Sequence, residues 1–189
     1  MEAHAGPTPM ALRKDAMQVS ARIMQEVVAC ALRHQPHGRG TVGMVQVFPN
    51  SRNVIPGRVK FSIDLRNSTD ALVDQMADEV KAFAAKVGQE HGVDVKIEMV
   101  SSYNAIAFHE NCVDAVGRAA RKLGYSNMPA VSGAGHDAVY MAKLAPSGMI
   151  FIPCKDGISH NEIEDAKPEH ITAGCNVLLH AMLERAGVV

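Results

Sequence analysis

The sequence predicts a mixed α/β protein in two parts, and three observations predict it. Amphipathic helical patterns, with apolar residues every three or four positions, alternate with short strand-like segments. Up to about Ala105 the strand-like segments alternate apolar and polar residues, whereas a later one is uniformly apolar. The length of 189 residues suits one large domain or two small ones. We therefore expect two domains, 1–105 and 106–189, with the boundary near Ala105.

The first part opens with a predicted helix and two predicted strands. Thr8 and Pro9 predict the start of the helix, as an N-cap hydroxyl followed by proline at the first helical position, and Gly38 follows its end. The segments "GTVGMVQVF" and "RVKFSIDLR" are the strands, and the second alternates strictly between apolar and polar residues. The apolar stripe of the helix comprises Leu12, Ala16, Val19, Ile23 and Val27.

A second helix and a third strand complete this part. The helix is expected from about Thr69 to His91, with Gly92 as its C-terminal stop. The alternating segment "VDVKIEMV" then predicts a strand. The order α-β-β-α-β matches a ferredoxin-like β-α-β-β-α-β unit without its first strand, because Met1–Ala5 is too short to supply it. The first part is thus predicted to be an incomplete ferredoxin-like unit.

The second part has a different pattern. A helix is expected in "ENCVDAVGRAARKLG", and "SGAGHDAVYMAKL" is a Gly-rich turn leading into another helix. The run "SGMIFIPC" is uniformly apolar, as in a parallel strand that is covered on both faces. Pro168 opens a last helix, for which the pattern predicts an inward stripe of Ile171, Cys175, Leu178 and Met182.

Composition argues against several classes of function. The net charge of −1 gives no basic field for nucleic acid or an anionic membrane, and no apolar run approaches the roughly 20 residues of a membrane span. The N-terminus has no secretory signal pattern. We therefore expect a cytoplasmic protein without a nucleic-acid or membrane partner. The cysteines are widely spaced and are expected to be reduced thiols: Cys30, Cys112, Cys154 and Cys175.

His160 is the first candidate site residue. It lies in "DGISHNEIED", directly after the apolar run, where open α/β sheets commonly place their ligands. Glu162 and Glu164 are plausible outer partners of a histidine that binds a metal ion. The alternative is a histidine of a surface loop, and one histidine does not make a metal site.

His136 in "GAGHDA" is the second candidate. Gly133 and Gly135 would let the backbone approach a ligand closely, and the N–H groups of a helix start favour an anion. The alternative is a tight turn in which Asp137 acts as an acid at the helix start. The glycine pattern is neither a dinucleotide fingerprint nor a P-loop.

Three further polar residues lie at junctions between loops and regular structure. For His4 in "HAGPTPM" and Asn53 in "NVIPG", the local sequence alone favours turn or cap chemistry over a functional role. Arg66 ends an alternating strand on its polar face, where it is either a solvated arginine or a fork for a carboxylate.

Six motifs in order carry a resemblance: "HAGPTPM", "RKDA", "NVIPG", "DLR", "SGAGHDA" and "IPCKDGISHNE". Over nearly its whole length the chain resembles the N-carbamoyl-L-amino-acid hydrolase and allantoate amidohydrolase branch of the dinuclear-metal aminoacylase/carboxypeptidase superfamily. The resemblance implies that residues 1–105 are most of a lid and dimerisation domain. It also implies that residues 106–189 are the C-terminal part of a metal-dependent, zinc-peptidase-like catalytic domain.

The resemblance also implies roles for the candidate residues. His160 matches the last metal ligand, and His4 matches the lid histidine that helps to bind the scissile group. Asn53 and Arg66 match lid residues that hold the substrate, with Arg66 on its carboxylate. His136 matches the histidine of the Gly-rich loop that faces the substrate, and the partner subunit of a homodimer is expected to bind through the lid.

The remaining ligands of such a centre are absent from the sequence. No histidine is followed two places later by Asp, and there is no Glu-Glu pair. The resemblance implies two divalent ions, zinc or manganese, in a complete enzyme, and we expect none or weak binding in this chain. The predicted function is hydrolysis of an N-carbamoyl-L-amino acid, ureidopropionate or allantoate, with this chain inactive alone. The alternatives are a non-enzymatic dimerisation module that binds small carboxylates and a dipeptidase or aminoacylase.

Overall fold

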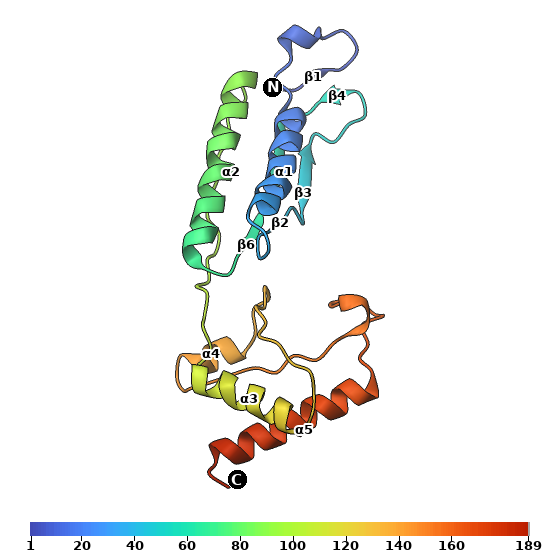
Figure 1. Cartoon of the computed structure of the whole chain (residues 1–189). Helices are drawn as coiled ribbons and strands as arrows, with labels where there is room; N and C mark the ends of the chain where they lie inside the picture. Colours follow the sequence, from blue (N-terminus) through green and yellow to red (C-terminus); the bar gives the residue numbers. More distant parts are fainter. Residues whose placement is uncertain (189) are drawn as a thin grey trace. The chain divides into compact units, whose positions relative to one another are not determined.

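A computed structural model describes residues 1–188 and divides into two compact units (Figure 1). The first comprises Met1–Ala105 and the second begins at Ile106. Helices combine with short antiparallel strands, so the α/β class is confirmed. No helix within residues 1–188 is both long enough and apolar enough to cross a membrane.

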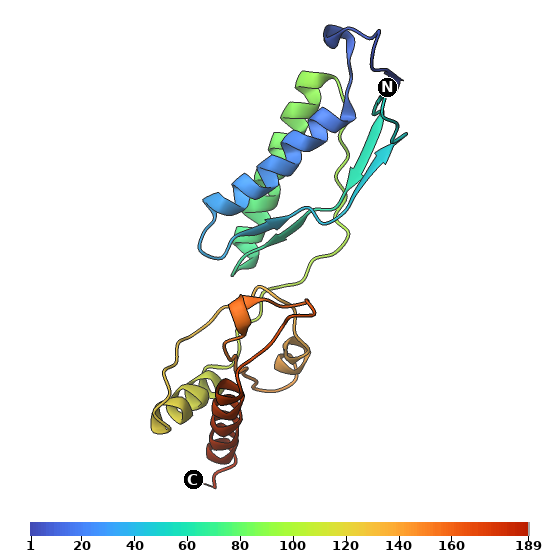
Figure 2. The ribbon, with the colours of Figure 1, turned by 90° about the vertical axis from the view of Figure 1, so that its right-hand side faces the viewer.

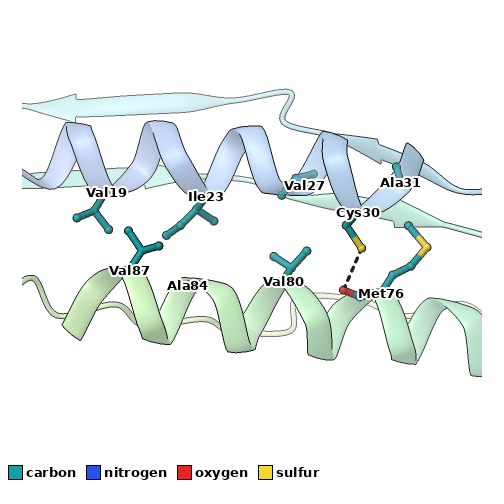
Figure 3. Packing of buried hydrophobic residues seen from close by; sticks show 9 residues of the cluster. All are labelled: Val19, Ile23, Val27, Cys30, Ala31, Met76, Val80, Ala84 and Val87. Carbon is teal, nitrogen blue, oxygen red and sulfur yellow. Dashed lines mark hydrogen bonds between the residues drawn. The ribbon is translucent and has the colours of Figure 1, made fainter. Parts of the chain in front are cut away.

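Two long helices form the core of the first unit. Helices α1 (Ala16–Arg33) and α2 (Asp70–His91) lie side by side, and their apolar side chains meet between them (Figure 3). Each fully buried aliphatic side chain of this kind stabilises the fold by about 1.5–3 kcal/mol relative to exposure. The buried cluster comprises Val19, Ile23, Val27, Cys30, Ala31, Met76, Val80, Ala84 and Val87.

Side-chain caps mark the starts of both helices, and a glycine ends α2. The Asp15 carboxylate accepts hydrogen bonds from the backbone N–H groups of Met17 and Gln18, so α1 begins after Asp15. The predicted start at Thr8 and Pro9 is therefore wrong, and a short 3₁₀ turn, η1 (Met10–Leu12), precedes the helix. The predicted boundaries of α2 are confirmed, with Thr69 as its N-cap and Gly92 at φ +59° as its C-cap.

Six short strands of the first unit form three antiparallel pairs (Figure 2). β1 (Ala3–His4) pairs with β4 (Val54–Ile55), β2 (Arg39–Thr41) with β6 (Asp64–Arg66), and β3 (Val45–Phe48) with β5 (Arg58–Phe61). The predicted strand over "RVKFSIDLR" is thus divided, because its two halves pair with different partners. Val47 faces Val59 in the longest ladder.

The predicted strand over residues 93–100 is wrong. No strand is assigned there, although Val93 and Val95 pack against the core of the first unit. The alternating pattern correctly indicated that one side of the segment contacts apolar groups. A β-strand also needs a hydrogen-bonded neighbour, and within residues 1–188 this segment has none.

The described part of the second unit, residues 106–188, contains three helices. α3 (Glu110–Lys122) packs against α5 (Pro168–Arg185), and α4 (Ala138–Ala142) and the 3₁₀ turn η2 (Lys155–Gly157) lie between them in sequence. The predicted inward stripe of α5 is wrong, because its residues are exposed and Val177 and Ala181 contact α3 instead. The buried cluster comprises Ala115, Ala119, Ala120, Val177 and Ala181.

The predicted buried strand over "SGMIFIPC" is also wrong. The segment has no strand assignment, and Phe151 is half exposed. All paired strands of residues 1–188 belong to the first unit, so this apolar run has no neighbouring strand. Uniform apolarity indicates a segment suited to burial on both faces, but the described residues cover it only in part: Ile150 packs against the buried cluster, whereas Phe151 stays half exposed.

Candidate functional site

His4 lies in a tightly hydrogen-bonded N-terminal loop. The β1–β4 ladder places it opposite Val54, and the next residue, Ala5, donates its N–H to the Asn53 carbonyl at 2.8 Å. The Arg13 guanidinium donates to the carbonyl oxygens of Ala5 at 2.6 Å and Thr8 at 3.1 Å. These contacts place the backbones of the predicted site residues His4 and Asn53 close together, with Asn53 directly before β4.

The hydrogen bonds of the two side chains show which atoms remain as donors. Nδ1 of His4 accepts a hydrogen bond from the Gly6 N–H at 3.0 Å, so the neutral imidazole carries its proton on Nε2. The Ser51 hydroxyl donates to Oδ1 of Asn53 at 3.1 Å, which leaves the amide nitrogen of Asn53 as a donor. Both side chains are exposed. Two N–H donors of this kind suit a carbonyl oxygen or an anion.

Arg66 lies elsewhere in the first unit, on β6, away from the β1–β4 ladder (Figure 1). Its guanidinium donates to the Asp64 carboxylate through Nε at 2.9 Å and through Nη2 at 2.7 Å. This pairing lowers the pKa of Asp64 and raises that of Arg66. One edge of the Arg66 guanidinium, which was predicted to bind a carboxylate, is therefore already bound to the Asp64 carboxylate.

The Gly-rich loop of the second unit holds His136. Its Nε2 lies 2.7 Å from the Ser132 hydroxyl oxygen, which also accepts a hydrogen bond from the Ala134 N–H at 3.1 Å. The imidazole meets the edge of Phe151, with 5.5 Å between ring centroids. A Cβ built on Gly133 or Gly135 would meet no atom within 4 Å, so packing within this unit does not require glycine at either position.

His160 lies in an exposed loop of the second unit. It adopts a left-handed backbone conformation, with φ of +57°, and its N–H donates to Oε2 of Glu164 at 3.0 Å. The loop forms a shallow, open hollow lined by His160, Asn161, Glu162 and Ile163. A non-glycine residue in this conformation is uncommon and is a reason to consider a functional role.

The residues around His160 do not form a metal centre by themselves. A zinc site needs three or four ligand atoms converging on one point. Among residues 1–188 the only group of three such side chains is Cys30, His34 and Glu79, in the first unit. Within residues 1–188, His160 therefore belongs to no group of three potential metal ligands, and a pair of ions does not fit here.

Sequence reasoning missed three sets of contacts. Ser132 lies in no nucleophile motif, and its contact with His136 depends on the geometry of the loop. Asp64 is two residues from Arg66 in the same strand, where the spacing places both side chains on one face. The third set is the group of Cys30, His34 and Glu79, whose only sequence signal is a Cys-x-x-x-His spacing within a helix.

Comparisons with known proteins cover nearly all of the chain. The model of peptidase family M20/M25/M40 matches residues 2–184. The chain is 46% identical over 188 residues to the N-carbamoyl-L-amino-acid amidohydrolase of Rhizobium meliloti, covering 100% of this chain and 45% of that enzyme. It is 31% identical over 183 residues to the allantoate amidohydrolase of Bacillus subtilis, covering 97% of this chain and 44% of the relative.

A solved structure gives the same result for the fold. An amidase of the hydantoinase/carbamoylase family from Burkholderia multivorans superposes with a TM-score of 0.94 and 52% identity, covering 98% of this chain and 45% of that one. The chain thus spans slightly less than half the length of the curated relatives it matches. With the family model matched over 183 residues, the chain belongs to peptidase family M20/M25/M40.

Proposed function

We propose that this chain is the C-terminal part of an amidohydrolase that cleaves a linear amide or carbamoyl C–N bond. The substrate would be an N-carbamoyl-L-amino acid, ureidopropionate or allantoate. The observation that carries the proposal is the 46% identity over 188 residues to an N-carbamoyl-L-amino-acid amidohydrolase. The exposed N–H donors of His4 and Asn53 support it, because an acyl-transfer transition state develops negative charge on an oxygen.

In this proposal the two units have different roles. The first unit, Met1–Ala105, is the lid and the homodimer interface, and it contributes His4, Asn53 and Arg66 to substrate binding. Nε2 of His4 and the amide nitrogen of Asn53 donate to the carbonyl oxygen of the scissile group. The guanidinium of Arg66 binds the substrate carboxylate, and Asp64 holds that guanidinium in orientation through two hydrogen bonds.

The second unit is the C-terminal part of the catalytic domain. His136 of the Gly-rich loop faces the substrate, and Ser132 fixes its ring through the 2.7 Å contact. His160 is one ligand of a zinc or manganese centre whose other ligands belong to polypeptide outside this chain. Because this chain does not hold such a centre by itself, we expect it to be inactive alone.

A hybrid enzyme tests the proposed function. The segment of the Rhizobium meliloti amidohydrolase that matches this chain is replaced by all 189 residues, and ammonia release is measured with N-carbamoyl-L-alanine, ureidopropionate and allantoate. Turnover of at least one of these is expected. His4→Ala and Asn53→Ala should each lower kcat by about 10²–10³, the effect of removing one oxyanion donor. Arg66→Lys should mainly raise KM.

The same hybrid provides the control variants and distinguishes the alternative functions. His37→Ala and Arg22→Lys replace the same residue types elsewhere in the first unit and should leave kcat and KM unchanged. Hydrolysis of dipeptides or N-acetyl amino acids, without carbamoyl turnover, would instead indicate a dipeptidase or aminoacylase. A folded, metal-loaded hybrid that turns over none of these substrates would contradict the proposal and favour a non-enzymatic module.

A further inference from the structure

Three potential metal ligands converge in the first unit at one end of the helix pair. Cys30 and His34 are four residues apart on α1 and so share one face, and Glu79 lies on α2. Nε2 of His34 is 2.9 Å from Oε1 of Glu79, and Sγ of Cys30 is 3.6 Å from Oε2. All three ligand atoms lie within 4.8 Å of one another. Figure 3 shows the Cys30 sulfur directed from α1 toward α2.

These separations are close to those of a zinc site. Ligand atoms at about 2.0–2.3 Å from a tetrahedral zinc ion lie roughly 3.3–3.8 Å from one another. The distance from the Cys30 sulfur to Oε2 of Glu79 falls in that range, and the distance from the His34 nitrogen to Oε1 is slightly shorter. With all three ligand atoms within 4.8 Å of one another, side-chain rotation is what an ion would require to bind all three.

Burial provides a second favourable condition. The Cys30 residue is 0% exposed and the His34 side chain is 10% exposed, whereas the Glu79 side chain is 31% exposed. Two ligands are thus held by packing between the helices, and the third opens to solvent. This arrangement restricts the ligands and leaves a route for an ion, with water as a fourth ligand.

The competing interpretation is a polar network without an ion. Nη2 of Arg33 donates to Oε2 of Glu79 at 2.9 Å, and Gln75 donates to Oε1 at 3.3 Å. Arg33 also donates to Glu26 at 2.5 Å, so it keeps an acidic partner when Glu79 turns toward an ion. The network therefore accounts for the state without an ion and does not prevent ion binding.

We propose that Cys30, His34 and Glu79 form a binding site for a thiophilic divalent cation of the zinc type, which cross-links α1 to α2. This proposal does not rest on the proposed function, in which none of these three residues has a role. Burial and the nearby Glu79 carboxylate raise the pKa of the Cys30 thiol to about 11. Without an ion the sulfur is therefore protonated, and binding forms a metal–sulfur bond and releases that proton to solvent.

Cobalt(II) is the probe, because its bond to a thiolate gives a near-ultraviolet charge-transfer band. The complete chain is stripped with a chelator and titrated with cobalt alone. One equivalent should produce the band, and the triple variant Cys112→Ser/Cys154→Ser/Cys175→Ser, which keeps only Cys30, should retain it. His34→Gln and Glu79→Gln should weaken cobalt binding at least tenfold, and Cys30→Ser should abolish the band.

Further variants test whether cobalt binds at another site and whether a loss of binding comes from unfolding. His160→Gln should leave the cobalt titration unchanged, since that histidine belongs to the second unit. Circular dichroism checks that each variant is folded, and His34→Gln, with a less buried side chain, serves as the test if Cys30→Ser unfolds. Zinc should raise the melting temperature of the unmodified chain but not of folded His34→Gln. Absence of the band in the triple variant, or its retention in folded His34→Gln at unchanged affinity, would overturn the proposal.

Discussion

The two units differ in how far they cover their own apolar residues. In the first unit, valines, isoleucine and methionine from α1 and α2 are completely enclosed between the helices (Figure 3). In the second unit the buried cluster consists of four alanines and one valine, and no paired strands cover it within residues 1–188. Both units contain enough apolar residues for a core, but only the first encloses large ones.

This difference is consistent with the proposal that polypeptide outside this chain completes the second unit. The stripe of α5 and Phe151 are both about half exposed among the described residues, and their apolar side chains are suited to further packing contacts. A helix with an apolar face of this size ordinarily packs against a sheet or another helix. The comparison therefore predicts which substitutions affect stability and which do not.

The largest expected effect is in the core of the first unit. Met76 is 0% exposed, and Met76→Ala should lower the free energy of unfolding by about 2–5 kcal/mol through lost burial and a cavity. Met182→Ala in α5 removes the same atoms from a residue that is 60% exposed, and should cost less than about 0.5 kcal/mol. Urea unfolding followed by hydrogen exchange of α1 and α5 peptides measures both. Equal costs would refute the contrast.

A second prediction concerns the exposed stripe of α5. Leu178→Gln/Met182→Gln should reduce binding of a neutral apolar dye such as Nile red about twofold, because the two residues lie on one helical face. Met10→Gln/Leu12→Gln changes two exposed residues of the first unit and should have little effect. Equal loss of fluorescence in both variants would show that the stripe is no special apolar surface.

The pH dependence of stability should differ between the units. Hydrogen bonds from His34 and Arg33 lower the pKa of Glu79 from 4.5 to about 2. A lowered pKa means that the ionised carboxylate stabilises the first unit above about pH 4.5, and that this contribution is lost as pH falls from 4.5 toward 2. We expect a loss of about 1 kcal/mol, since a carboxylate nearly one-third exposed is partly screened.

Glu79→Gln tests this loss. Urea midpoints at pH 7 and pH 3, read from hydrogen exchange of α1 and α2, should change less with pH in this variant than in the unmodified chain. Glu184→Gln in the second unit, whose carboxylate pairs with Arg118 on an exposed surface, is the matched control and should leave that difference intact. An unaltered pH response in Glu79→Gln would contradict the assignment.

The smallest effect is expected at the start of α5. α1 and α2 are capped by Asp15 and Thr69, whereas Lys167 at the start of α5 makes no side-chain cap. Lys167→Ser should therefore stabilise α5 by about 0.5–1 kcal/mol, and Asp15→Ala should destabilise α1 by about 1 kcal/mol. Hydrogen exchange of the first helical turns measures both effects. Destabilisation of α5 by Lys167→Ser would contradict the prediction, because it would show that lysine is the better N-cap residue at this position.

Local patterns predicted the elements that depend on local interactions. Thr69 and Gly92 bound α2 as expected, because capping needs only neighbouring residues. Residues 93–100 and the run around Phe151 were predicted as strands, and their patterns report burial but not the presence of a pairing partner. α1 begins after Asp15, because the Asp15 carboxylate accepts a hydrogen bond from an N–H of the first helical turn. The Thr8 hydroxyl caps no helix and donates to the His4 carbonyl.

The candidate site was predicted unevenly for a similar reason. His4 and Asn53 were identified through motifs, and their adjacency follows from a ladder of only two residue pairs, too short to recognise in sequence. Glu79 lies 45 residues from His34, so its convergence with Cys30 and His34 depends on the packing of α1 on α2. The roles of His136 and His160 remain predictions.

The most direct test of the central proposal is ammonia release by the purified 189-residue chain alone. It is incubated with N-carbamoyl-L-alanine, ureidopropionate and allantoate in the presence of zinc or manganese, beside the hybrid enzyme. We predict no release above buffer from the chain and clear release from the hybrid, because the isolated chain offers only His160 to the proposed centre. Steady turnover by the chain alone would contradict the account.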